Sequence, residues 1–195
     1  GQWLMRLPQE DFCYFFVCSP FRKYENDGGA GLKALFGTLR QSVNAEADMK
    51  TLMTAQVLFW LLRAPDGHAK NFSIQLLPRG RFQLTPLYDV MSVYPVSSNA
   101  PNQWSPHEIK LAMALFGKNR HYEMQGIQRR RFNSTVQKVG YASTAEPIIE
   151  ETLARTPAAI AEVQAELPQD FSPRVLDAIL GGLEQAARTL GGMPP

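Results

Sequence analysis

The stretch "DGHAKNFSIQLLPRGRFQLTPLYD", residues 66–89, decides how the middle of the chain folds. Phe72, Ile74 and Leu76 alternate along the chain with Ser73, Gln75 and Leu77, and the alternation resumes at Phe82 and Leu84. The residues between the two runs, Pro78-Arg79-Gly80-Arg81, favour a turn. Period-two alternation on both sides of a turn predicts a β-hairpin.

Three polar residues flank this hairpin. Asp66 lies just before the first strand, Asn71 begins it, and Asp89 follows the second strand. A hairpin brings its two ends together, so we expect Asn71 and Asp89 to be neighbours with Asp66 beside them. Each residue alone is a common turn or strand-end residue. Together they fit phosphoryl transfer, in which one carboxylate orients the attacking hydroxyl while an Asn oxygen and a second carboxylate hold Mg²⁺. Protein kinases use this order and spacing, so the pattern favours a kinase-type site.

The rest of the chain predicts mostly helix around this hairpin. A length of 195 residues with 45% hydrophobic content suits one core, so we expect a single domain over residues 1–195. The predicted fold class is mostly α with a small β-hairpin. The expected helices are one from Pro8 ending near Ser19-Pro20, then 31–40, 45–63, 107–116, 146–167 and 173–190.

Composition excludes several classes of function. A net charge of +2 gives no general argument for binding nucleic acid or membranes. No apolar run reaches the roughly 20 residues that span a bilayer. Cys13 and Cys18 lack a second pair of ligands nearby, which disfavours zinc and favours free thiols in a reducing compartment. We therefore expect a cytoplasmic protein.

Five blocks of the sequence resemble, in order, the C-terminal half of the HipA family of bacterial serine/threonine protein kinases, toxins of type II toxin–antitoxin pairs. The blocks are "RLPQEDFC", "KYENDGGAG", "DGHAKNFSI", "LTPLYDVMSVYP" and "IKLAMALFGKNRHY", and the resemblance runs from about residue 3 to residue 190. It implies a protein-kinase-like C-terminal lobe that uses ATP and Mg²⁺. It also implies a HipB-like, DNA-binding antitoxin as partner and an aminoacyl-tRNA synthetase as a candidate protein substrate.

The resemblance also assigns roles to individual residues. Asp66 would be the proton acceptor, and Asn71 and Asp89 the magnesium ligands. The residues expected at the nucleotide are Gln9, His68, Lys70, Asn71, Tyr88 and Asp89.

The family's phosphate-binding loop and ATP-contacting lysine would lie upstream of the QED block, and the sequence has no counterpart of either. The chain thus resembles a C-terminal lobe separated from its N-terminal lobe. We expect that, alone, it folds but does not transfer phosphate, because positioning from both sides of the nucleotide is needed.

A basic cluster follows in the chain. It comprises Lys118, Arg120, Arg129, Arg130, Arg131 and Lys138, with the single acid Glu123 among them. Such a cluster, with Tyr122 and Phe132, suits nucleic-acid phosphates. The plainer interpretation is a solvated helix face that pairs with the acidic C-terminal helices. The resemblance implies a third interpretation, in which the cluster lies close to the DNA that the antitoxin binds.

Three hypotheses follow. The first is an ATP- and Mg²⁺-dependent protein kinase lobe. The second is a kinase-derived module without activity that binds an antitoxin. The third, a metal-dependent hydrolase using Asp66, His68 and Asp89, lacks the usual spacing of histidine ligands.

Overall fold

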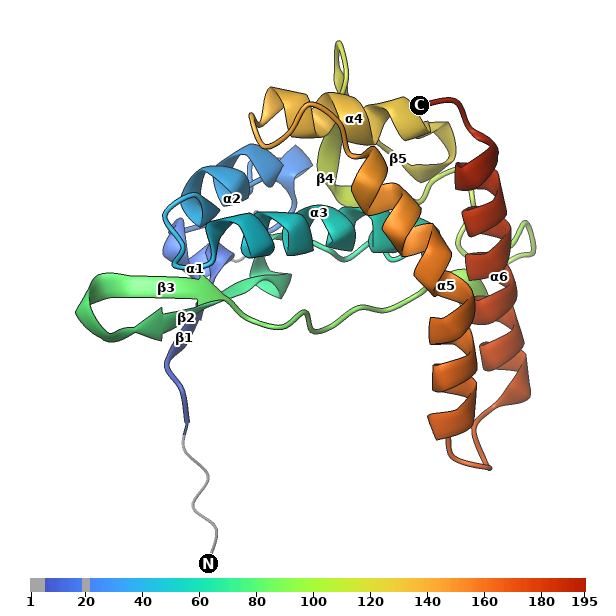
Figure 1. Ribbon diagram of the computed structural model, residues 1–195. Coiled ribbons are helices and arrows are strands. Elements are labelled where there is room, and N and C mark those ends of the chain that lie inside the picture. The colour runs from blue at the N-terminus through green and yellow to red at the C-terminus, as the bar shows by residue number, and fades with distance from the viewer. Residues whose placement is uncertain (1–5, 19–21) are drawn as a thin grey trace, which may run out of the picture.

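The structure, a computed structural model, describes residues 6–18 and 22–195. Helices dominate it, with two small antiparallel sheets (Figure 1). The helices are α1 (Phe12–Phe15), α2 (Leu32–Leu39), α3 (Ala45–Leu61), α4 (Arg129–Lys138), α5 (Glu146–Glu166) and α6 (Pro173–Gly192). The strands are β1 (Gln9–Asp11), β2 (Ser73–Leu77), β3 (Arg81–Leu84), β4 (Lys110–Phe116) and β5 (Arg120–Glu123).

Helix α3 runs through the middle of the molecule, with α2, α5 and α6 packed against it (Figure 1). Its first turn carries Glu46 and Asp48, which suit the positive end of the helix dipole. The following residues are buried on nearly every side of the helix, as expected for a helix that crosses a core. Its last helical residue is Leu61, and Pro65 follows, so the chain leaves the helix just before the polar stretch at residue 66.

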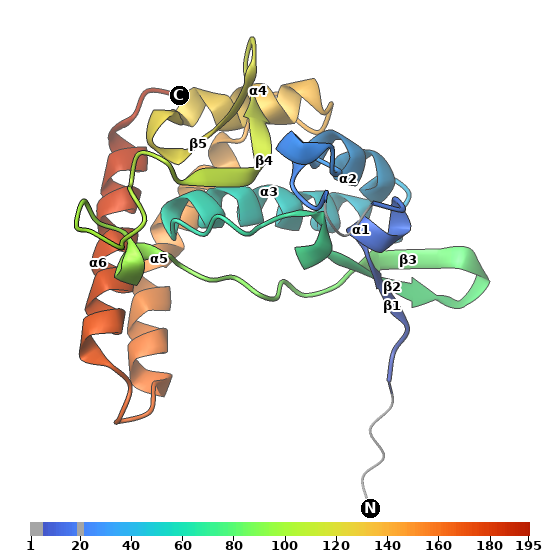
Figure 2. The same ribbon diagram turned by 180° about the vertical axis from the view of Figure 1, so that it is seen from behind.

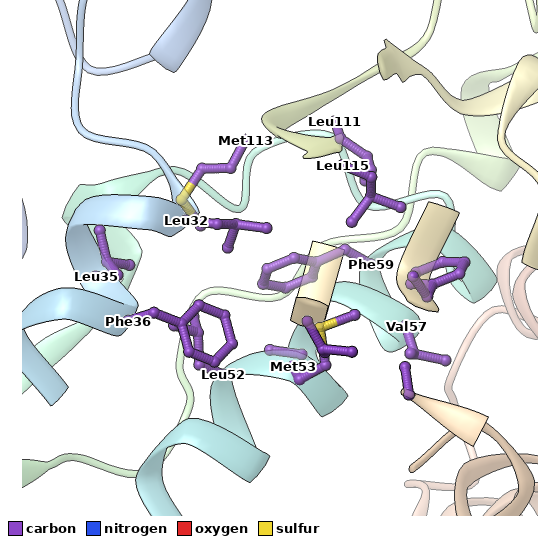
Figure 3. Close-up of a cluster of buried hydrophobic side chains, with 14 of the residues drawn as sticks. Leu32, Leu35, Phe36, Leu52, Met53, Val57, Phe59, Leu111, Met113 and Leu115 are labelled. Carbon is purple, nitrogen blue, oxygen red and sulfur yellow. The ribbon is translucent and has the colours of Figure 1, made fainter. Parts of the chain in front are cut away.

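The core lies where α2, α3 and β4 meet. Figure 3 shows side chains from these three elements directed toward one another. They are Leu32, Leu35 and Phe36 from α2, Leu52, Met53, Val57 and Phe59 from α3, and Leu111, Met113 and Leu115 from β4. Because all three elements contribute fully buried side chains, their relative positions are fixed by close packing.

The predicted hairpin is present as β2 and β3, and β1 adds a third strand on the other edge of β2. All three strands are antiparallel, with Gln9 opposite Gln75 and Gln75 opposite Gln83. The N-terminal prediction was therefore wrong in part: residues 9–11 form a strand, and only Phe12–Phe15 form the helix. Its predicted end at Ser19-Pro20 lies outside the described residues.

The predicted helix over residues 107–116 was also wrong, because Lys110–Phe116 forms strand β4. It pairs with β5 in a second hairpin, in which Phe116 lies opposite Arg120. Short apolar runs do not distinguish a buried strand from a buried helix by periodicity. Leu, Ala and Met favour helices locally, but pairing with β5 and burial against the core override that preference.

The C-terminal predictions are confirmed: α5 and α6 cover the predicted ranges, and each begins with a proline in its first turn. The two helices lie side by side and extend beyond the rest of the molecule (Figures 1 and 2). No helix among the described residues is both long and apolar enough to cross a membrane.

A buried carboxylate, Asp48, ties α3 to the three-stranded sheet. Its Oδ2 accepts hydrogen bonds from the backbone N–H of Leu84, at 2.8 Å, and from the Ser42 hydroxyl. We expect Asp48→Ala to lower the free energy of unfolding by about 1–3 kcal/mol, since the N–H of Leu84 would be buried without a partner and Ser42 would keep only its 3.3 Å contact to the carbonyl of Phe82. Urea denaturation measures this. The matched control is Asp177→Ala, an exposed Asp of α6, which should change stability by less than about 0.5 kcal/mol. Equal effects from the two variants would contradict the role assigned to Asp48.

Candidate active site

The three polar residues that flank the hairpin lie together. The side-chain amide of Asn71 donates to the backbone carbonyl of Asp66 at 2.9 Å and to Asp89 Oδ2 at 3.2 Å. Asn71 is buried, whereas Asp66 is partly exposed and Asp89 is exposed. One buried amide thus joins the segment after α3 to the segment after β3.

Close packing against α3 fixes the backbone of residues 66–68. Gly67 lies against the ring of Phe59, and a Cβ atom at Gly67 would lie only 2.2 Å from that ring. Phe59 itself packs edge-on against Phe72, with ring centroids 5.9 Å apart. The glycine in "DGHAKN" is therefore required by contact with the core.

The segment that carries Asp89 is held by its neighbour Tyr88. The Tyr88 hydroxyl donates to the backbone carbonyl of Lys70 at 2.9 Å and lies 2.6 Å from the Ser73 hydroxyl. Asp89 has a φ of 56°, in the left-handed region that Asp tolerates better than most residues. The left-handed backbone and the Tyr88 anchor together direct Asp89 toward Asn71.

The carboxylate of Asp66 is held through one oxygen. Its Oδ1 accepts a hydrogen bond from the Tyr24 hydroxyl at 2.5 Å and lies 3.5 Å from Lys23 Nζ. Burial, and then the hydrogen bond to Asp66, raise the pKa of Tyr24 to about 12, so the phenol stays protonated and acts as the donor. Sequence reasoning missed Tyr24 and Lys23: "KYENDGGAG" predicts a loop, but nothing local indicates a contact 42 residues away.

His68 lies behind Asp66 in the interior. It is 2% exposed, packs edge-on against the ring of Tyr24, and its Nε2 is 3.4 Å from Asp66 Oδ1. Burial lowers its pKa below the usual value, even though Asp66 opposes that shift, so the ring is neutral at pH 7. His68 therefore contacts Asp66 from the interior, and its ring is not exposed on the surface.

Two further residues predicted at the nucleotide are exposed. Lys70 lies one residue before Asn71, and its backbone carbonyl is the acceptor for Tyr88. Gln9 lies in β1, on the edge strand that pairs with β2. Lys70 lies in the same short 3₁₀ turn as Asn71, Ala69–Asn71, whereas Gln9 lies in the sheet, and neither side chain makes a hydrogen bond in the described part of the chain.

A groove of about 770 Å³ opens beside Asp66. Lys23, Tyr24 and Asp66 form one part of its lining, and the lining also includes Met91, Trp104 and Tyr122. Met91 and Trp104 are 62% and 55% exposed, so large apolar side chains line the same groove as Asp66. Neither Asn71 nor Asp89 is among the described residues that line the groove. Of the three polar residues, Asp66 is the one that lies in both the groove and the hydrogen-bonded group.

The basic cluster is divided between structural and exposed side chains. Arg129 is buried and pairs with Glu146 and Glu150 of α5. Arg120 lies 3.6 Å from Glu25, and Lys138 donates to the backbone carbonyl of Gly117. For Arg129 the pairing with an acidic C-terminal helix is thus the observed arrangement, while Lys118, Arg120, Arg130 and Lys138 are exposed.

The oxygen atoms at Asn71 and Asp89 are the donors available for a cation. Within residues 6–18 and 22–195, no group of three or more His, Cys, Asp or Glu side chains could hold a metal ion, and Cys13 and Cys18 are free thiols. Two oxygen donors suit Mg²⁺, which keeps several waters and is completed by substrate phosphates. They do not suit a zinc site with a full set of protein ligands.

Comparison with known proteins agrees with this architecture. A family model described as the HipA-like C-terminal domain matches residues 2–160. A Sinorhizobium fredii protein named "Putative kinase Y4mE" is 27% identical over 174 residues, which cover 89% of this chain and 38% of that protein. The chain therefore belongs to the HipA-like C-terminal domain family.

A solved structure has the same fold. It is a chain of the Shewanella oneidensis complex of HipA, HipB and operator DNA, with a TM-score of 0.81 and 22% identity. The match covers 98% of this chain and 46% of that chain. The chain spans less than half the length of these two relatives.

The contact between Gly67 and Phe59 gives a test of how the site is built. We expect Gly67→Ala to destabilise the protein by about 1–3 kcal/mol, because the added methyl overlaps a buried ring. Gly126→Ala is the matched control, since a Cβ there meets nothing within 4 Å. Thermal unfolding compares the two. A Gly67→Ala protein as stable as Gly126→Ala would contradict the packing described here.

Proposed function

We propose that this domain is the catalytic lobe of a HipA-like serine/threonine protein kinase, which transfers the γ-phosphate of ATP to a protein hydroxyl with Mg²⁺. The observation that carries the proposal is the placement of Asp66. Asp66 lines an open groove, and its backbone carbonyl accepts a hydrogen bond from Asn71, the partner of Asp89. A base between an acceptor groove and a cation site is the arrangement that phosphoryl transfer requires.

In this proposal the acceptor hydroxyl enters from the groove and is oriented by the carboxylate of Asp66. Asp66 accepts the hydroxyl proton as the new bond to phosphorus forms. Tyr88 and Asn71 hold the segment of Asp89 at a fixed distance from Asp66, which supplies the positioning on which such reactions depend.

The residues fit a magnesium ion. Asn71 Oδ1 accepts no hydrogen bond from the described residues, and Asp89 is exposed, so both can supply oxygen donors. When bound, Mg²⁺ would neutralise charge on the nucleotide phosphates. Lys70 is exposed beside Asn71, and its ammonium group suits the same phosphates.

A HipB-like antitoxin is the proposed partner, because the Shewanella oneidensis relative of the same fold was solved with HipB and operator DNA. A module that only binds this partner is the alternative, and it would not require the ordered Asp66 carboxylate. An aminoacyl-tRNA synthetase as substrate stays a prediction from the family resemblance. The hydrolase hypothesis is weakened by His68, since both of its ring nitrogens are buried and not available as ligands.

The proposal predicts that Asp66→Asn abolishes transfer while nucleotide affinity changes little. Loss of a general base costs about 100-fold or more in rate, whereas Asp66 is not assigned to the cation. The assay follows labelled phosphate from ATP to casein, using the longest natural polypeptide that contains this domain. Transfer by Asp66→Asn at the unaltered rate would remove Asp66 from the mechanism.

A second prediction concerns magnesium. We expect Asp89→Ala to weaken Mg²⁺-dependent ATP binding more than Asn71→Ala, because a carboxylate attracts a hard dication more strongly than an amide oxygen. Magnesium titrations at fixed nucleotide measure this, with Asp177→Ala as the control. The differences should vanish when EDTA removes the metal. Indistinguishable titrations for Asp89→Ala and the control would rule out the cation site.

A further inference from the structure

The segment of residues 22–31, which we name the Tyr24 loop, contacts Asp66 although it lies far away in sequence. The loop contains the short 3₁₀ turn Glu25–Asp27 and then two glycines in positions that exclude side chains. At Gly29 a Cβ atom would lie 2.5–2.8 Å from the backbone carbonyls of residues 22–24. The backbone of the loop is therefore folded tightly on itself directly behind Tyr24.

Glu25 anchors this loop to the body of the domain. It is 7% exposed, and its Oε2 accepts a 2.7 Å hydrogen bond from the backbone N–H of Ala114 in β4. Arg120 of β5 lies 3.6 Å from Oε1. Gly31 leaves room for this carboxylate, since a Cβ there would lie 2.2 Å from it. A buried, hydrogen-bonded carboxylate one residue from Tyr24 fixes the position of the tyrosine relative to the second hairpin.

The contacts of the loop converge on one oxygen of Asp66. Tyr24 donates to Oδ1 at 2.5 Å, which is the short distance typical of a hydroxyl bonded to a carboxylate. Lys23 Nζ lies 3.5 Å from the same oxygen and 5.1 Å from the centroid of the Tyr24 ring. Among the residues that the structure describes, none donates a hydrogen bond to Asp66 Oδ2.

We propose that Tyr24 is a positioning residue: it holds Oδ1 of Asp66 so that Oδ2 stays available to the acceptor hydroxyl in the groove. This rests on the proposed function, since it assigns Tyr24 a role through Asp66. A carboxylate without this bond rotates about its χ torsions, and only some orientations present an oxygen to the groove. Lys23 acts in the same direction but more weakly, because its contact is longer and its side chain is 36% exposed.

The test compares Tyr24→Phe with the unaltered protein, in the longest natural polypeptide that contains this domain. Tyr24→Phe keeps the ring that packs on His68 and removes only the hydroxyl. We expect kcat for transfer to casein to fall about 10- to 100-fold, as for a misplaced catalytic group. KM for ATP and the melting temperature should stay unchanged, which a merely structural role would not produce. Lys23→Gln should lower kcat less, and it carries the test if Tyr24→Phe folds poorly.

The matched control is Tyr141→Phe. Tyr141 is also a partly buried tyrosine packed on an aromatic ring, that of Phe36, and its hydroxyl makes no hydrogen bond within the described residues. It should leave kcat, KM and melting temperature unchanged. Equal losses of kcat in Tyr24→Phe and Tyr141→Phe, or a loss matched by a fall in melting temperature, would overturn the positioning role.

Asp66→Asn separates the two proposals. If Asp66→Asn is inactive while Tyr24→Phe is as fast as the unaltered protein, the role of Tyr24 is wrong and the proposed function stands. If Tyr24→Phe is faster, Tyr24 restrains Asp66 instead of preparing it, which also overturns the inference. If Asp66→Asn is fully active, the proposed function itself fails.

Discussion

The side-chain amide of Asn71 connects the parts of the candidate site. It donates to the backbone of Asp66 and to the carboxylate of Asp89, which lie on opposite sides of the first hairpin in sequence. A buried amide that lost these acceptors would carry an unsatisfied donor in the interior. The bonds are therefore required for burial, and they keep the two carboxylates at a fixed separation.

A few contacts also fix the two segments on either side of this amide. Gly67 allows the backbone of Asp66 to rest on Phe59, so the position of the carboxylate is set by the core. Tyr88 holds the other side by bonding to the backbone of Lys70. The groove beside Asp66 opens between the Tyr24 loop and the segment that follows β3. The site is thus built on α3 and the first hairpin, and the groove beside it is completed by the Tyr24 loop and by residues between Met91 and Gly126.

The second hairpin connects the site to the rest of the domain. β4 contributes Leu111, Met113 and Leu115 to the core, as Figure 3 shows, and the N–H of Ala114 donates a hydrogen bond to the buried carboxylate of Glu25. Arg120 in β5 neutralises part of that carboxylate's charge. Part of the basic cluster therefore has a structural purpose, because Arg120 and Arg129 compensate carboxylates from other elements. Lys118, Arg120, Arg130 and Lys138 are exposed, so solvent or a partner can reach them.

The sequence by itself determined α2, α3, α5, α6, the first hairpin and the grouping of Asp66, Asn71 and Asp89. These features follow from periodicity, from proline and glycine at element ends, and from short separations along the chain. Only the tertiary structure decided that residues 110–116 form a strand, that residues 9–11 join the sheet, and that Tyr24 bonds to Asp66. Strand β4 depends on packing against α2 and α3, β1 on pairing with β2, and the position of Tyr24 on the hydrogen bond between Glu25 and β4, so each depends on a partner far away in sequence. Local sequence patterns do not predict such partners, because the packing and hydrogen bonds that stabilise these contacts form only in the folded chain.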